Sequence, residues 1–121
     1  MSRYSPPGLH NIIADQGATF SQVVTWKDSA RTVINTTGYT ARMHVRETAD
    51  SNTTVLVLTT ENDRISVDGA NGIFELTVSA SDMANVTADK YVYDLEIVAP
   101  VSGTVNRLLY GNFVVRAEVT R

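Results

Sequence analysis

Residues 38–47 read Gly-Tyr-Thr-Ala-Arg-Met-His-Val-Arg-Glu, and apolar and polar side chains alternate along them. Successive side chains of a β-strand point to opposite faces, so this alternation predicts one buried face and one solvent-exposed face. The apolar set is Tyr39, Ala41, Met43 and Val45, and the polar set is Thr40, Arg42, His44 and Arg46. Arginine and histidine are rarely buried without partners, so the segment predicts a half-buried strand of an antiparallel sheet.

The composition is that of a single globular domain. The chain has 121 residues, of which 43% are hydrophobic, enough to build a core. It has no cysteine, which excludes disulfides, cysteine-ligated zinc and thiol nucleophiles. The net charge of −3 gives no reason to expect a nucleic-acid partner.

No segment of the sequence suggests a membrane or a secretory pathway. The longest apolar runs fall well short of the ~20 residues that span a bilayer. The first residues lack the apolar stretch of a signal peptide. We therefore expect a protein that folds in a reducing cytoplasm and has no membrane partner.

Further strands follow the first at short intervals. Alternating or β-branched runs cover residues 18–26, 54–59, 64–67, 73–79, 90–98, 105–110 and 113–120. Residues 68–72, Asp-Gly-Ala-Asn-Gly, give the strongest turn signal, and Gly111 is expected to bend or bulge the last strand. Many short strands separated by turns predict an all-β fold, an antiparallel β-sandwich.

One short helix is expected at about residues 80–86. Ser79 can cap its first turn, and Asp82 stands at the position that completes the capping pattern. Met83 and Val86 are spaced to face the sheets, so the helix should plug one end of the sandwich.

The chain divides into residues 1–14, expected to be an extended N-terminal arm, and residues 15–121, the sandwich. Pro6 and Pro7 favour an extended conformation, and Gly8 removes this restriction on the chain that follows. Two interpretations of the arm stay open: a disordered tail, or a segment that orders on a neighbouring subunit.

No residue pattern predicts catalysis, a metal or a cofactor. His10 and His44 are the only histidines, and neither has a second ligand at metal-binding spacing. Asp94 and Glu96 share a strand face about 7 Å apart. That spacing can serve glycoside chemistry, but an exposed acidic stripe is the commoner meaning. We therefore expect no enzyme activity.

Six segments of the chain, taken in order, carry a resemblance to a known family: residues 16–20, 26–29, 37–43, 72–79, 91–96 and 108–115. They resemble a small domain found in structural proteins of tailed bacteriophages, namely the N-terminal domain of phage upper baseplate proteins. The resemblance covers about residues 15–120. It implies an immunoglobulin-like sandwich that attaches to a virion by protein–protein contact, with no catalytic residues. One departure is Thr87-Ala88-Asp89-Lys90, which stands where such domains usually have a glycine.

The resemblance implies a non-enzymatic virion protein that docks on the tail or baseplate as an adaptor, oligomeric within the particle and made in the host cytoplasm. Because no receptor-binding extension follows in this sequence, an adaptor, plug or decoration is expected. One alternative is a capsid decoration protein that clamps neighbouring shell subunits. A second, suggested by Trp26 and the tyrosines, is a carbohydrate-binding module. The candidate interface residues are Tyr4, Pro6, Pro7, Leu9, Arg42, His44, Arg46 and Tyr110.

Overall fold

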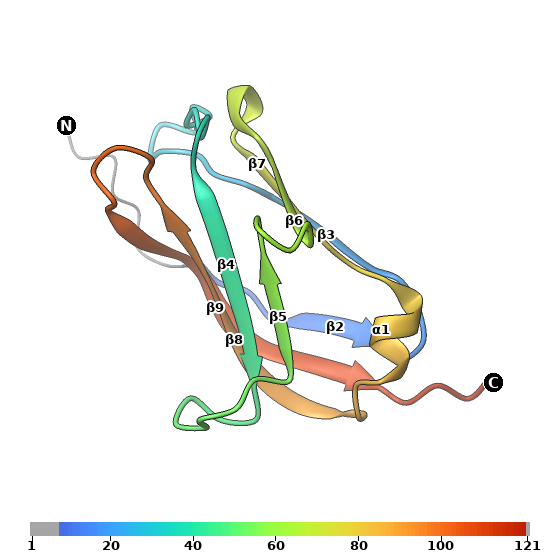
Figure 1. The fold of residues 1–121 in the computed structure, drawn as a ribbon. Helices are drawn as coiled ribbons and strands as arrows, with labels where there is room; N and C mark the ends of the chain where they lie inside the picture. The colour runs from blue at the N-terminus through green and yellow to red at the C-terminus, as the bar shows by residue number, and fades with distance from the viewer. Residues whose placement is uncertain (1–7, 121) are drawn as a thin grey trace.

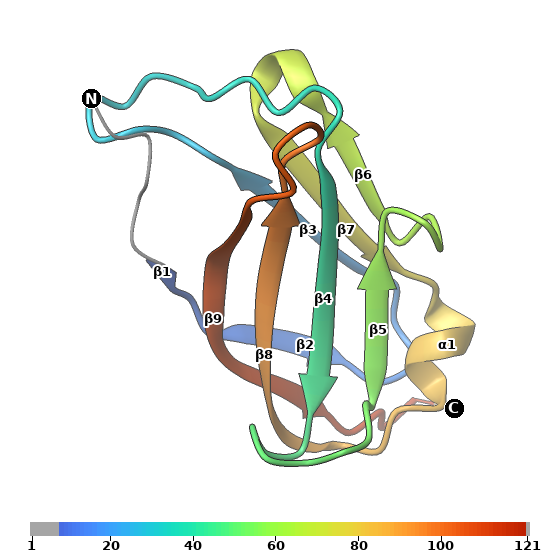
Figure 2. The same ribbon diagram turned by 60° about the vertical axis from the view of Figure 1, so that its left-hand side comes forward.

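Two β-sheets pack face to face in the computed structural model, which describes residues 8–120 (Figure 1). The larger sheet has the strand order β1-β9-β8-β4-β5, and β2 also pairs with β9. The smaller sheet has the order β3-β7-β6 and lies behind the larger one in Figure 2. Residues 8–120 form an immunoglobulin-like all-β sandwich with one short α-helix, as the sequence predicts.

The bounds of β3 to β8 follow the predicted segments to within a few residues, whereas β9 joins two predicted segments and β1 and β2 lie where the sequence predicts no strand. The larger sheet consists of β1 Gly8–Leu9, β2 Ile12–Asp15, β4 Thr40–Arg46, β5 Leu56–Thr59, β8 Asp89–Val98 and β9 Val105–Arg116. The smaller sheet consists of β3 Phe20–Thr25, β6 Ile65–Asp68 and β7 Ile73–Val78.

Strand β4 confirms the alternation read in residues 38–47. Ala41, Met43 and Val45 are buried between the sheets. Arg42 points to solvent, and His44 and Arg46 are partly exposed on the same outer face. The strand lies between β8 and β5, so its inward side chains reach the middle of the core.

The core is built around aromatic rings from both sheets. Phe113 makes edge-to-face contacts with Phe20 and Tyr93, at centroid distances of 5.4 and 6.3 Å. Trp26 is buried and packs edge-to-face against Tyr39. The predicted part of Trp26 in a sugar-binding surface is therefore wrong, because its ring belongs to the core.

The helix α1, Ala80–Ala84, closes one end of the sandwich (Figure 1). Ser79 caps it by accepting a hydrogen bond from the backbone N–H of Asp82, and Met83 is fully buried. The helix ends two residues before the predicted Val86, which is nevertheless buried. The predicted turn at residues 68–72 contains the 3-10 segment Gly69–Asn71, closed by Gly72 in the left-handed conformation.

The N-terminal segment corrects the expected domain boundary. Strands β1 and β2 pair in parallel with β9, and Ile12 and Ala14 are only 3% and 4% exposed. Residues 8–14 are extended, but they are part of the sheet, so the sandwich begins before residue 15. The sequence hides this, because the exposed Ile13 breaks the alternation of a strand only four residues long.

Candidate functional site

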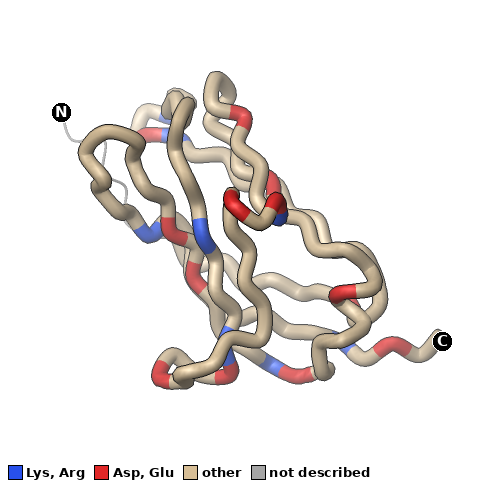
Figure 3. The backbone as a smooth tube through the Cα atoms, in the orientation of Figure 1, with Lys and Arg blue, Asp and Glu red and all other residues tan. Residues whose placement is uncertain are grey.

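The outer face of the larger sheet carries cross-strand rows of polar side chains. In one row Arg42 lies opposite Glu96, which lies opposite Arg107. In the next row His44, Asp94, Tyr110 and Leu9 follow one another from β4 to β1. Figure 3 shows charges of both signs interleaved along β4, β8 and β9.

Each carboxylate of this face has an arginine partner. The Nε of Arg42 lies 2.8 Å from Oε1 of Glu96, and Nη1 of Arg107 lies 3.9 Å from Oδ2 of Asp94. Asp94 and Glu96 are thus separate members of a mixed-charge surface, and their geometry does not single them out as an acid–base pair.

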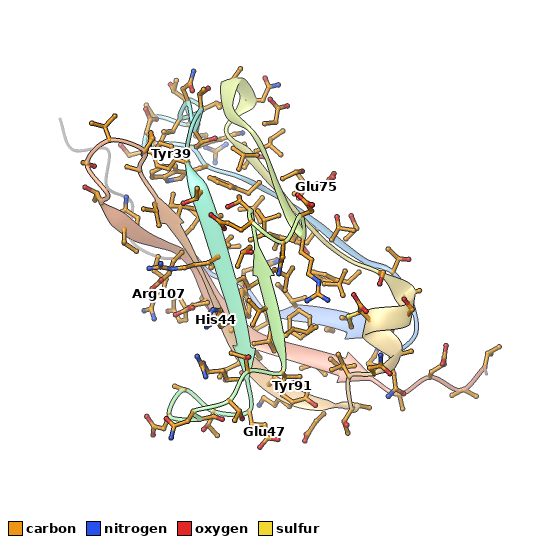
Figure 4. The ribbon with its side chains drawn as sticks, viewed as in Figure 1. Tyr39, His44, Glu47, Glu75, Tyr91 and Arg107 are labelled. Carbon is orange, nitrogen blue, oxygen red and sulfur yellow. The ribbon has the colours of Figure 1, made fainter. Side chains whose placement is uncertain are left out.

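Arg107 is also held by an aromatic ring. Its guanidinium carbon lies 5.0 Å from the centroid of Tyr110, a distance typical of cation–π contacts. Figure 4 shows Arg107 and His44 on the outer side of the larger sheet, and Glu75 on the other sheet. Tyr110 is 37% exposed, so it presents an aromatic surface to solvent beside the guanidinium of Arg107.

A hollow of about 400 Å³ opens on this face between the β4–β5 loop and the N-terminal strands. Its lining mixes apolar, amide and charged groups. The lining residues are Leu9, Asn11, His44, Arg46, Ala49, Val92, Tyr93, Asp94, Arg107, Tyr110, Gly111 and Asn112. We call this set, together with Arg42 and Glu96, the outer-face site.

The loop side of the hollow is positioned by Arg46. Its guanidinium donates to the carbonyl of Ser51 at 3.0 Å, and Nη2 lies 3.2 Å from Nδ1 of His44. A guanidinium nitrogen can only donate, so Nδ1 of His44 would be the acceptor of this hydrogen bond. The loop and the imidazole are therefore held by one arginine.

The N-terminal side of the hollow is positioned by β9 and β8. The hydroxyl of Tyr93 donates to the carbonyl of His10, and the side-chain oxygen of Asn11 accepts from the backbone N–H of Asn112. At Gly111 a Cβ atom would come within 2.6 Å of the carbonyl oxygen of His10. Glycine therefore permits the close approach that brings Leu9 beside Tyr110.

Partial burial raises the pKa of Asp94, and the neighbouring charge of Glu96 adds to this. Arg107, His44 and Arg46 act in the opposite direction. Asp94 is thus a partly desolvated carboxylate that lies between the negative charge of Glu96 and the side chains of Arg107, His44 and Arg46.

The structure brings together four of the predicted interface residues, Leu9, His44, Arg46 and Tyr110, which all line the hollow. Arg42 lies on the same face, in the adjacent row, outside the hollow. Tyr4, Pro6 and Pro7 lie outside the described residues. Whether these residues bind a partner stays a prediction.

Sequence reasoning missed Arg107, because a register shift hides the face to which it belongs. Leu95 pairs with Leu109 but Glu96 pairs with Arg107, so Leu108 is an extra residue in β9. Arg107 and Tyr110 therefore share the outer face although they are three residues apart. The predicted irregularity of this strand thus lies at Leu108, and β9 continues through Gly111.

Within residues 8–120 no group of three His, Asp or Glu side chains could hold a metal ion. In the same range no helix has the length and apolar character needed to cross a bilayer.

No protein-family model matches the sequence, and no curated protein matches it either.

Proposed function

We propose that this protein is a non-enzymatic virion structural protein that docks through the outer-face site onto another protein of a tailed-phage particle, at the tail or baseplate. The observation that supports docking is the convergence of Leu9, His44, Arg46 and Tyr110 on one hollow. The phage assignment rests on the sequence resemblance alone.

The chemistry of the outer-face site is that of a protein–protein interface. Tyrosine and arginine are enriched at the centres of such interfaces, and here Tyr110 and Arg107 contact each other. A single site of this size gives modest affinity, but a particle with many copies multiplies the contacts.

Incorporation into purified particles tests the docking role. We expect Tyr110→Ala and Arg107→Ala to lower the number of copies per particle, measured by quantitative mass spectrometry. Glu75→Ala is the matched control, because Glu75 is exposed on the smaller sheet. Equal incorporation of all three variants contradicts docking through the outer-face site.

The same measurement separates the tail from the capsid. A dozen or so copies per particle favours the tail or baseplate, and hundreds of copies favour a decoration protein that clamps shell subunits. The absence of the chain from purified particles contradicts both assignments.

A second candidate function is carbohydrate binding, which the exposed ring of Tyr110 favours because it stands beside the amides of Asn11 and Asn112. Sugar rings stack on exposed aromatic rings of this kind, and amide groups form hydrogen bonds with the hydroxyls of the sugar. Binding of the purified domain to a glycan array, lost in Tyr110→Ala, favours this function over docking.

A further inference from the structure

The edges of the two sheets are protected unequally. At β5, the outer edge of the larger sheet, side chains occupy the outward backbone groups. The carbonyl of Val57 accepts from Asn62 Nδ2 and Arg64 Nη1, both at 2.9 Å, and the N–H of Thr59 donates to Asn62 Oδ1 at 2.9 Å. A strand protected in this way cannot easily accept another strand.

Strand β6, one edge of the smaller sheet, is short and charged. It has four residues, ends in Asp68 and follows Asp63 and Arg64 directly. Short length and flanking charges are the usual means by which an edge avoids pairing with another chain.

Strand β3, the other edge of the smaller sheet, has neither protection. It has six residues, and no charged residue occurs between Gln16 and Trp26. The N–H of Trp26 donates to the carbonyl of Gly72, across β7. Bonding alternates along an antiparallel pair, so the backbone groups of Ser21, Val23 and Thr25 point away from β7.

Within residues 8–120, the only hydrogen bond to these outward groups is a long one, from Gln22 Nε2 to the carbonyl of Val23 at 3.5 Å. The side chains of Ser21, Val23 and Thr25 are also exposed, and Val23 is 51% exposed. The edge therefore combines free backbone groups with an exposed apolar side chain at its middle.

We propose that β3 pairs antiparallel with β3 of a second copy of this chain, across a two-fold axis at Val23. This proposal is independent of the docking partner proposed above. In the resulting register, Val23 lies opposite Val23 of the second copy. On either side of the axis, Ser21 of one copy lies opposite Thr25 of the other. Each of these pairs exchanges two backbone hydrogen bonds.

The second copy fits because the strand is complementary to itself. Val23 buries its exposed surface against Val23 of the second copy, and the hydroxyl of Ser21 comes within reach of the hydroxyl of Thr25 of the second copy. No like charges meet, since β3 carries none. The two smaller sheets become one continuous sheet, and the two outer-face sites are left uncovered, as expected of an isologous dimer that still docks elsewhere.

Sedimentation velocity of the full chain over a range of concentrations tests the dimer. We expect a mass approaching twice the 13.2 kDa of one chain for wild type and for Ser66→Lys, and the mass of one chain for Val23→Lys. Ser66 is the matched control, because it is also an exposed strand residue of the smaller sheet, on β6. Val23→Lys places like charges against each other across the axis.

Cysteine cross-linking tests the register without depending on Val23→Lys. The chain has no cysteine, and directly opposed residues of a hydrogen-bonded pair lie within reach of a disulfide. We expect oxidised Val23→Cys to migrate as a covalent dimer in non-reducing gels and Ser66→Cys to remain a single chain.

Three results overturn the proposal: a wild-type mass of one chain at every concentration, a dimer that survives Val23→Lys, or failure of Val23→Cys to cross-link. A chain lacking residues 1–7 is measured in parallel. If it dimerises while the full chain does not, the chain's own N-terminus covers β3, and the proposal is wrong.

Discussion

Phe74 and Glu75 are neighbours on β7 but have opposite environments, because the strand turns alternate side chains to the core and to solvent. Phe74 has no exposed surface, whereas Glu75 is exposed. We expect Phe74→Ala to lower the free energy of unfolding by about 3–5 kcal/mol, through lost burial and the cavity left behind. Glu75→Ala should change it by less than about 0.5 kcal/mol. Urea unfolding of the two variants checks this, and equal effects would contradict the assignment of faces.

Tyr93 has a buried ring whose hydroxyl donates to the carbonyl of His10. Burial raises the pKa of Tyr93 from 10.0 to about 12, because the phenolate is disfavoured away from water. The folded state therefore holds this proton more tightly than the unfolded state. The stability that results is fully present below pH 10 and is lost as the pH rises to about 12.

Tyr93→Phe isolates this effect. The variant removes the ionisable group and the hydrogen bond, so below pH 10 we expect it to be less stable than wild type by about 1 kcal/mol. Between pH 10 and about 12 it should lose stability less steeply than wild type. Urea unfolding at a series of pH values measures both, and parallel pH profiles would show that Tyr93 does not ionise on unfolding.

At the scale of the element, β9 shows how one strand serves both the core and the surface. The extra residue Leu108 changes its phase, so Leu109 faces inward opposite Leu95 while Arg107 and Tyr110 face outward. Without this shift Arg107 and Tyr110 would lie on opposite faces, since they are an odd number of residues apart. The outer-face site therefore depends on an irregularity of one strand.

Gly111→Ala tests the packing of β1 and β2 on β9. A Cβ at residue 111 would come within 2.6 Å of the carbonyl oxygen of His10, so the N-terminal segment must move. We expect a loss of about 1–3 kcal/mol in unfolding free energy and faster hydrogen exchange in residues 8–15. The control is Gly8→Ala, whose added Cβ would lie 3.4 Å from the Leu109 side chain and 3.8 Å from the carbonyl oxygen of Leu108, both ordinary contact distances. Similar exchange rates in both variants would contradict the close approach.

At the scale of the whole molecule, the N-terminal segment is part of the sandwich. Asp15 and Arg116 join β2 to the end of β9 through two hydrogen bonds, of 2.7 and 3.1 Å, and the arginine holds the pKa of Asp15 below its usual value. Together with the buried Ile12 and Ala14, this pair fixes the order of the larger sheet at that edge.

Truncation measures how much this segment contributes. We expect a chain lacking residues 1–14 to lose at least about 3 kcal/mol, because Ile12 and its strand pairing are removed from the core. A chain lacking only residues 1–7 is the comparison that isolates residues 8–14. Thermal unfolding followed by circular dichroism measures both, and identical midpoints would mean that residues 8–14 form a dispensable arm.

The sequence by itself determined the fold class, most strand positions and the short helix. Those features follow from local alternation and capping, which Met43, Phe74 and Ser79 display within a few residues of chain. The sequence also placed His44 and Arg46 on a solvent-exposed face, because alternation along one strand is enough to assign its side chains to two faces.

Only the tertiary structure decided that residues 8–14 join the sheet, that Arg107 and Tyr110 share a face, and that β3 has an open edge. Strand order, register shifts and edges depend on pairing between segments far apart in the chain, as between Ile12 and Phe113. One-dimensional periodicity carries no record of such pairing, so the candidate surfaces emerge only when the strands are assembled.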